Sequence, residues 1–172
     1  MKKTNHLVPA ALIGITLAGC ASTGGNAVWV PPPGSEVQVN MEISAGSKSR
    51  VYIQDGRTME RPGVSVTSPY CYFTLDRVAP APGDTFSIQP GTFRVTKSYR
   101  VRSSASAIDL QYAGRAGSDQ TLSTIMELGD GGQAEVDRLT CSRWGMISED
   151  GWLTIKEMQS TLSPLVDIRP EV

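Results

Sequence analysis

Three cysteines, Cys20, Cys71 and Cys141, are the residues of this 172-residue chain whose type and spacing point most directly to chemistry. Cys20 follows a positively charged start and a short apolar stretch that ends in small residues, which is the build of a secretory signal peptide. The apolar run over residues 7–19 is shorter than the roughly 20 residues that a membrane-spanning helix needs. If the segment is only a plain signal peptide or a single membrane-spanning helix, it gives Cys20 no chemical role.

The four residues Leu17-Ala18-Gly19-Cys20 resemble the lipobox of bacterial lipoprotein precursors. The resemblance implies that residues 1–19 are a signal peptide that is removed. It also implies that Cys20 carries acyl chains such as palmitate, which serve as the membrane anchor. Residues 20–35 would then be the lipidated cysteine and a flexible tether, because small polar residues give slack and prolines form an extended spacer.

Cys71 and Cys141 remain as a pair in a chain that would enter an oxidising compartment. Alternation along Tyr70–Leu75 puts Cys71 on the same strand face as Phe73, and Cys141 shares its face with Leu139. Both sulfurs therefore point with the apolar side chains, as a buried bridge requires. We predict a structural disulfide that closes a loop of about 70 residues. Two free buried thiols and a redox pair are the alternatives, although no Cys-x-x-Cys motif is present.

The sole histidine, His6, lies within the signal segment, so the mature chain would contain none. Its absence excludes Ser-His-Asp and Cys-His catalysis, histidine proton shuttles and the usual histidine-based metal sites. The sequence also has no nucleophile-elbow motif, no phosphate-binding glycine-rich loop and no zinc pattern. We therefore expect no metal, no cofactor and no enzymatic activity. A hydrolase that uses carboxylates alone is the alternative.

The charge balance narrows the class of partner. Loss of Lys2 and Lys3 with the signal would leave 14 basic against 17 acidic residues. A slightly acidic chain is not suited to general binding of nucleic acid or of an anionic membrane surface. We expect the membrane as a partner through the lipid anchor, an envelope protein or peptidoglycan as a further partner, and no nucleic acid.

Arginines supply the first part of a candidate binding surface. Alternation along a strand expected over Phe93–Arg102 puts Arg94, Arg100 and Arg102 on one face. Three guanidinium groups in a row can meet an anionic glycan or a lipid headgroup. A solvated strand face that is balanced by neighbouring acids is the alternative.

Aromatic residues supply the second part of the candidate binding surface. Tyr70, Tyr72, Trp144 and Trp152 can form a surface for a sugar or a peptide, and packing into the core is the alternative. The residues that we select for the possible binding surface are Tyr70, Tyr72, Arg94 and Arg100.

Period-two hydrophobic patterns separated by Pro-Gly and Asp-Gly turns indicate a mainly β domain. Turns every 8 to 12 residues or so predict an antiparallel sheet, a sandwich or a small barrel. Residues 103–117 are expected to be a loop with a brief strand at 108–112. The expected strands cover residues 37–43, 50–54, 64–67, 70–75, 85–88, 93–102, 121–128 and 139–144.

One short C-terminal α-helix interrupts this pattern. Thr154 and Glu157 fit a capping box, and Leu153 and Met158 are placed as the hydrophobic staple around it. Pro164 would end the helix. We expect residues 36–172 to form one β-rich globular domain in which this helix covers a face or an open end of the sheet.

Segments of this domain are similar to small proteobacterial outer-membrane lipoproteins of unassigned function, notably residues 51–57, 69–73 and 139–144. Ala21 and Ser22 lack the Asp that commonly retains lipoproteins in the inner membrane. The resemblance therefore implies a location on the periplasmic face of the outer membrane. We expect a non-catalytic accessory or binding module of the cell envelope. The loop Ser44–Ser49 also resembles the Ser-Gly loop of lipoprotein inhibitors of lysozyme, although its order Ser-Ala-Gly departs from their Ser-Gly pair. Inhibition of a lysozyme-type enzyme is therefore an alternative function, and a plain hairpin loop is the alternative structure.

The anchor is expected to depend on one sulfur atom. Cys20→Ser removes the acylated group, and stable anchoring needs more than one acyl chain. We expect loss of the membrane-bound mature form and accumulation of the uncleaved precursor, measured by fractionation and immunoblotting. A Cys20→Ser protein that still matures and stays with membranes after a salt wash would rule out lipidation.

Overall fold

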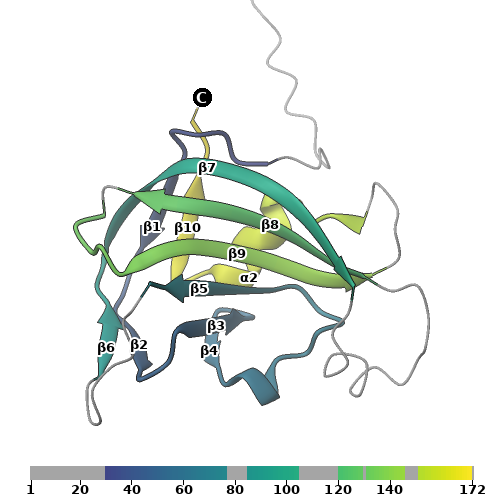
Figure 1. Cartoon of the computed structure of the whole chain (residues 1–172), viewed down its shortest axis with the longest axis horizontal. Helices are drawn as coiled ribbons and strands as arrows, with labels where there is room; N and C mark the ends of the chain where they lie inside the picture. The colour runs from purple at the N-terminus through teal and green to yellow at the C-terminus, as the bar shows by residue number, and fades with distance from the viewer. Residues whose placement is uncertain (1–29, 77–84, 105–119, 130, 146–150, 172) are drawn as a thin grey trace, which may run out of the picture.

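The structure, a computed structural model, describes residues 30–76, 85–104, 120–129, 131–145 and 151–171 (Figure 1). Cys20 and the expected signal peptide lie outside these residues, as does the brief strand expected at 108–112. The described chain forms β1 (Glu36–Val39), β2 (Ile43–Gly46), β3 (Arg50–Gln54), β4 (Arg57–Met59), a 3-10 turn η1 (Arg61–Gly63), β5 (Tyr70–Leu75), β6 (Phe86–Ile88), β7 (Gly91–Ser104), β8 (Gln120–Gly129), β9 (Val136–Gly145), α2 (Ile155–Leu162) and β10 (Val166–Arg169).

Eight of these strands form one antiparallel sheet in the order β10-β1-β7-β8-β9-β5-β3-β4, while β2 and β6 pair separately. The sheet curls into a half-barrel, and α2 lies behind β9 and β5 in Figure 1. The predicted mainly β, antiparallel fold with one short helix near the C-terminus is confirmed.

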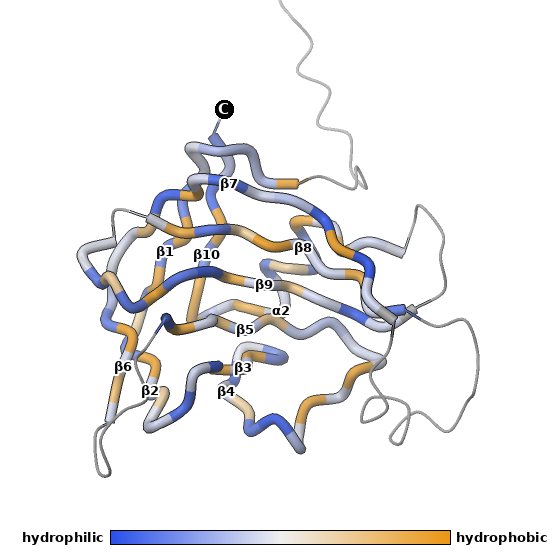
Figure 2. The backbone as a smooth tube through the Cα atoms, viewed as in Figure 1, coloured by the Kyte–Doolittle hydropathy of each residue, from blue (hydrophilic) through white to orange (hydrophobic). Residues whose placement is uncertain are grey.

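The concave face of this sheet carries the hydrophobic core. Apolar and polar residues alternate along the strands, as the changes of colour in Figure 2 show. Val37, Phe93, Met126, Leu139 and Ile53 come from five different strands, and each is at most 1% exposed. Because side chains alternate between faces, these strands send the named apolar residues inward and leave the residues next to them on the convex face.

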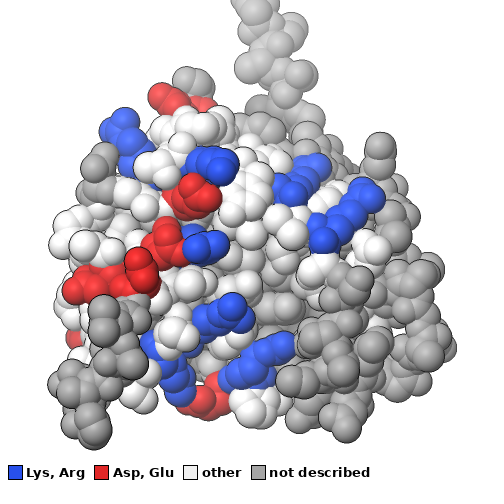
Figure 3. Space-filling view, in the orientation of Figure 1, with Lys and Arg blue, Asp and Glu red and all other residues white. Residues whose placement is uncertain are grey.

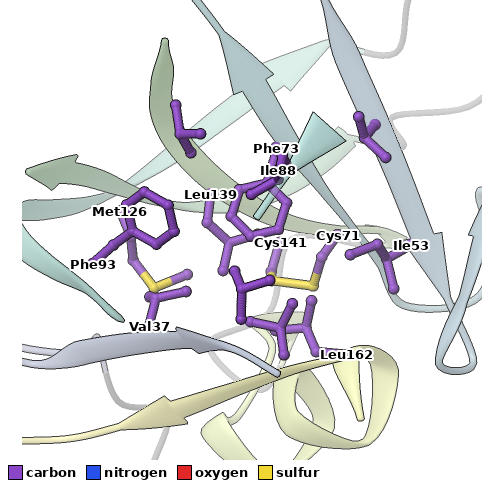
Figure 4. Packing of buried hydrophobic residues seen from close by; sticks show 14 of the residues in the cluster. Val37, Ile53, Cys71, Phe73, Ile88, Phe93, Met126, Leu139, Cys141 and Leu162 are labelled. Carbon is purple, nitrogen blue, oxygen red and sulfur yellow. A yellow bond between two sulfur atoms is a disulfide. The ribbon is translucent and has the colours of Figure 1, made fainter. Parts of the chain in front are cut away.

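The predicted disulfide is confirmed and lies in this core. Cys71 on β5 and Cys141 on β9 are register partners, and their sulfurs are bonded. Both residues are fully buried. The bond lies beside Leu162 of α2 in Figure 4, so the disulfide and the helix belong to one packed layer.

The capping box at the start of α2 is also confirmed. Thr154 Oγ1 accepts a hydrogen bond from the Glu157 backbone N–H, and the Glu157 carboxylate accepts one from the Thr154 N–H. Leu153 and Met158, the expected staple, are both buried in the core. The helix ends at Leu162, directly before the Ser163–Pro164 peptide.

The far end of α2 reaches one edge of the sheet. The β3–β4 turn uses Asp55 and Gly56 with positive φ values of 51° and 69°, as a two-residue hairpin requires. The Gly56 N–H donates to the Thr161 carbonyl oxygen at 2.9 Å. The chain then continues into β10, which pairs with β1 at the opposite end of the sheet order. The helix therefore bridges the two ends of the curled sheet.

The strand expected over residues 37–43 is wrong in extent, because it divides into β1 and β2 at residues 40–42. Asn40 leaves the ladder there: its backbone N–H donates to the Leu165 carbonyl, and its side-chain amide donates to the Pro164 carbonyl and to Asp167. The strand expected over residues 64–67 is absent from the structure, and β4 and β10 are strands that the sequence analysis did not predict.

The packed domain begins before residue 36. Pro31 and Ser35 are buried, the Gly34 N–H donates to the Val95 carbonyl at 2.8 Å, and the Val95 N–H donates to the Ser35 carbonyl at 2.7 Å. The last residues of the expected tether thus extend the pairing of β7. Among the described residues, no helix is long and apolar enough to cross a membrane.

The disulfide is expected to be a major source of stability. It closes a loop with a sequence separation of 70 residues. Cys71→Ala with Cys141→Ala should lower the free energy of unfolding by about 2–5 kcal/mol, mainly through the unfolded chain. Chemical denaturation measures this loss. A double variant that unfolds at the same denaturant concentration as the wild type would contradict the prediction.

The helix cap predicts a pH-dependent stability. Burial alone raises the pKa of Glu157, but hydrogen bonds from Thr154 and the nearby charge of Arg143 outweigh it and hold that pKa below its ordinary value of 4.5. Ionised Glu157 therefore stabilises the fold above its unfolded-state pKa, and this contribution is lost as the pH falls through the lower folded-state pKa.

We expect Glu157→Gln to lower the free energy of unfolding at pH 7 and to approach the wild type as the pH drops below 4.5. Thr154→Ala should cost about 1 kcal/mol at pH 7. Glu135→Gln, which changes an exposed carboxylate elsewhere, is the control. A Glu157→Gln deficit that is the same at pH 3 and pH 7 would contradict the role of the charge.

Candidate functional site

Three tyrosines gather on the convex face of the sheet, opposite the disulfide. Tyr52 on β3 is the register partner of Tyr72 on β5, and their ring centroids lie 5.2 Å apart. Tyr70, two residues along β5, has its centroid 6.4 Å from each of the other two rings. Tyr52 and Tyr70 are buried, whereas Tyr72 is half-buried.

Two arginines lie over these rings. The Arg50 guanidinium is 5.3 Å from the Tyr72 centroid, and the Arg61 guanidinium is 5.6 Å from the Tyr52 centroid. Both distances are within the range of a cation–π contact. Since the two rings are neighbours, the two guanidinium groups are held over adjacent parts of one aromatic cluster.

Hydroxyl groups on β8 and β9 complete a pocket beside the arginines. Tyr70 is the register partner of Ser142, which in turn pairs with Ser123. The two serine Oγ atoms lie 2.8 Å apart and are hydrogen-bonded. The pocket has a volume of about 190 Å³ and is lined by Arg50, Tyr52, Arg61, Tyr70, Tyr72, Ser103, Thr121, Ser123 and Ser142. We refer to it as the tyrosine–arginine pocket.

Gln54 fixes the chain segment that carries Arg61. Its side-chain amide donates to the Ser65 carbonyl at 2.9 Å and to the Pro69 carbonyl at 3.1 Å, and its Oε1 accepts from the Ser65 N–H at 2.9 Å. These bonds occupy backbone groups of the segment that the sequence analysis expected to be a strand. The segment instead lies over the tyrosines, and Val64 packs against Tyr52 and Tyr70.

The tyrosine–arginine pocket is suited to bind a negatively charged, hydroxylated group. Guanidinium groups donate several hydrogen bonds in a planar fork, and serine and threonine hydroxyls both donate and accept. The described residues that line the pocket are arginines, tyrosines, serines and a threonine. The pocket therefore offers positive charge together with hydroxyl groups that donate and accept hydrogen bonds.

Two further hollows adjoin the pocket. Arg50 lines all three, and Lys48 and Glu60 line both of the others. Lys48 and Glu60 form an ion pair with each other. The hollows have volumes of about 330 and 550 Å³. Part of the Ser44–Ser49 segment that resembles the inhibitor loop lines the smaller one, although its first half belongs to β2.

The structure brings together only two of the four residues selected from the sequence. Tyr70 and Tyr72 line the tyrosine–arginine pocket, whereas Arg94 and Arg100 do not. Arg94 is exposed between the buried residues Phe93 and Val95. A register shift between Val95 and Lys97 follows, and it reverses the side-chain alternation of β7.

Arg100 consequently faces the concave side. It is the register partner of Thr124, which pairs with the buried Cys141, and its guanidinium lies 5.1 Å from the Trp152 ring centroid. Arg102 contacts the same ring at 5.7 Å. Burial lowers the pKa of the Arg100 guanidinium from its ordinary value. The expected row of three arginines on one face is therefore wrong.

The two tryptophans do not belong to the cluster of three tyrosines. Trp152 is buried at 6% exposure beneath the two arginines. Trp144 is half-buried near the end of β9, where its backbone N–H donates to the Val66 carbonyl. Neither lines the tyrosine–arginine pocket.

Of the described residues that line the pocket, only Tyr70 and Tyr72 were selected from the sequence, and those that were missed are Arg50, Tyr52, Arg61, Ser103, Thr121, Ser123 and Ser142. Arg50 and Arg61 begin β3 and η1, and nothing in their local sequence distinguishes them from solvated charges. Ser123 and Ser142 are small polar residues in the outward alternation of β8 and β9. Their meeting depends on strand pairing, which the local sequence does not carry.

Charges are unevenly spread over the face drawn in Figure 3. Acidic side chains lie mostly toward the left of the view, whereas basic side chains extend over the centre and the right. Across the described ranges, no three His, Cys, Asp or Glu side chains are grouped so that they could hold a metal ion. No protein-family model, no curated protein and no solved structure matches this chain.

Proposed function

We propose that this protein is a lipid-anchored, non-catalytic binding module of the bacterial cell envelope, held through Cys20 at the periplasmic face of the outer membrane. The lipobox-like residues before Cys20 support the anchor. The observation that carries the binding role is the tyrosine–arginine pocket, which combines two guanidinium groups with a hydroxyl row formed by Thr121, Ser123 and Ser142.

A binding role accounts for the composition of the pocket. In a chain without a mature histidine, carboxylates are the acid–base groups that a hydrolase would most often use at the reacting group. The pocket instead presents arginine and tyrosine side chains, which dominate the binding energy of many protein interfaces. The rigid sheet beneath them holds these side chains in place before a ligand arrives, which lowers the entropy cost of binding.

The proposed anchor is compatible with a pocket that is directed away from the membrane. The chain from Cys20 to Val30 reaches at most about 35 Å when fully extended. The described part of the chain begins at Val30, beside β7 and near the C-terminus in Figure 1, whereas β5, β3 and β4 lie on the opposite side of β7. We therefore propose that the ligand is on the periplasmic side, as an envelope protein or peptidoglycan would be.

Retention on envelope material tests this function. The detergent-solubilised full-length protein would be incubated with isolated peptidoglycan sacculi and, separately, with membranes, and the bound fraction measured by immunoblotting. Charge-assisted hydrogen bonds contribute about 1.5–3 kcal/mol each, so Arg50→Gln with Arg61→Gln should reduce retention at least about tenfold.

Arg94→Gln removes the same kind of charge from an exposed position outside the pocket, so it is the matched control. It should retain wild-type binding. Equal losses in the pocket variant and in Arg94→Gln, or binding that neither variant changes, would contradict a role for the pocket.

A further inference from the structure

We infer that the tyrosine–arginine pocket is an oxyanion site, which binds a phosphate or carboxylate group carried on a hydroxyl-rich molecule. The inference rests on the proposed binding function of the same pocket and gives its ligand a chemical class.

The arrangement of Arg50 and Arg61 supports an oxyanion. Cation–π attraction to the faces of Tyr72 and Tyr52 favours positions of the two guanidinium groups over these rings, which restrains their motion. A restrained planar fork loses less side-chain entropy when it forms paired hydrogen bonds to the oxygens of a phosphate or carboxylate. Because the two rings are neighbours, both guanidinium groups are near enough to one pocket to contact the same ligand group.

The hydroxyl row favours a ligand that has hydroxyl groups in addition to its charged group. Ser142 is 1% exposed and Ser123 is 9% exposed, so both hydroxyls lie at the floor of the pocket rather than in open solvent. Thr121 lies farther along the same wall. Hydroxyls that donate and accept are suited to the hydroxyl groups of a saccharide or polyol.

The charge of the whole protein does not explain anion binding. The formal net charge is −1, so the overall field does not attract anions, and any selective binding must come from local groups. Among the described residues that line the adjoining hollows, Glu60 is the acidic one, and its ion pair is with Lys48. Arg50 lines all three hollows.

Isothermal titration calorimetry on the detergent-solubilised full-length protein tests the inference. The probes are glucose 6-phosphate, glucose, glycerol 3-phosphate and inorganic phosphate. We expect saturable binding of glucose 6-phosphate, binding at least about tenfold weaker for glucose, and a further loss at high salt. Tighter binding of glucose 6-phosphate than of glycerol 3-phosphate would assign a saccharide as the source of the anion, whereas the reverse order would assign a lipid headgroup. Either order supports an oxyanion site.

Variants locate the binding. Arg50→Gln should weaken glucose 6-phosphate binding at least about tenfold, and Ser142→Ala should weaken it less, because it removes a neutral hydrogen bond. Arg94→Gln should leave the affinity within about twofold of the wild type. Unchanged melting temperatures confirm that the variants fold.

Equal affinity for glucose and glucose 6-phosphate, or no binding of any anion by a folded wild type, would overturn the oxyanion assignment. If the Arg50→Gln, Arg61→Gln variant still loses its retention on envelope material in that case, the binding function stands and only the ligand class is wrong. If retention is also unchanged, both are wrong.

Discussion

The concave face of the eight-stranded sheet must be covered by apolar side chains, and α2 packs there against β10, β5 and β3. Each large side chain that is fully buried there contributes about 1.5–3 kcal/mol. The helix supplies Met158 and Leu162, both fully buried, and its C-terminal end accepts the Gly56 N–H from the β3–β4 turn. The Cys71–Cys141 bond fixes β5 to β9 directly beside this helix. The curvature of the sheet, the position of α2 and the disulfide therefore all depend on one buried layer of side chains.

That layer also decides what the convex face contains. Because strand residues alternate, an inward Cys71 requires an outward Tyr70 and Tyr72, and an inward Cys141 requires an outward Ser142. The tyrosine–arginine pocket is thus built from the outward partners of the core residues. The irregularity between Val95 and Lys97 is the exception, since it keeps Arg94 outside and turns Arg100 inward toward Trp152. A single extra residue in one strand separates two arginines that the sequence places on one face.

Features encoded by neighbouring residues could be predicted from the sequence. The strands Arg50–Gln54 and Tyr70–Leu75, the Asp55-Gly56 turn and the Thr154–Glu157 capping box are all confirmed, since each depends on alternation, turn preference or cap chemistry within a few residues. β10 also alternates, through Val166 and Ile168, but it is only four residues long. Its pairing with β1, more than a hundred residues earlier, is not encoded locally.

Less of the candidate site could be predicted from the sequence, because the site also depends on pairing between strands that are distant in the chain. Tyr70 and Tyr72 could be selected from the sequence because aromatic side chains can form a surface for a sugar or a peptide. The contribution of Arg50, Arg61 and the two serines depends on the order β8-β9-β5-β3, which joins residues up to 92 positions apart. Gln54 shows why the strand predicted over residues 64–67 does not form. Its amide binds the backbone of residues 65 and 69, so a segment that alternates like a strand becomes a cover over the tyrosines.

The most direct test of this account is a residue-by-residue map of ligand contact in solution. Amide chemical-shift changes would be recorded by NMR while glucose 6-phosphate is added to the isotopically labelled, detergent-solubilised full-length protein. We predict that the largest chemical-shift changes fall on Arg50, Tyr72 and Ser142, which come from three adjacent strands of the sheet and line the pocket on its convex face. Changes centred on Arg94, or on Arg100 and Trp152, would contradict it.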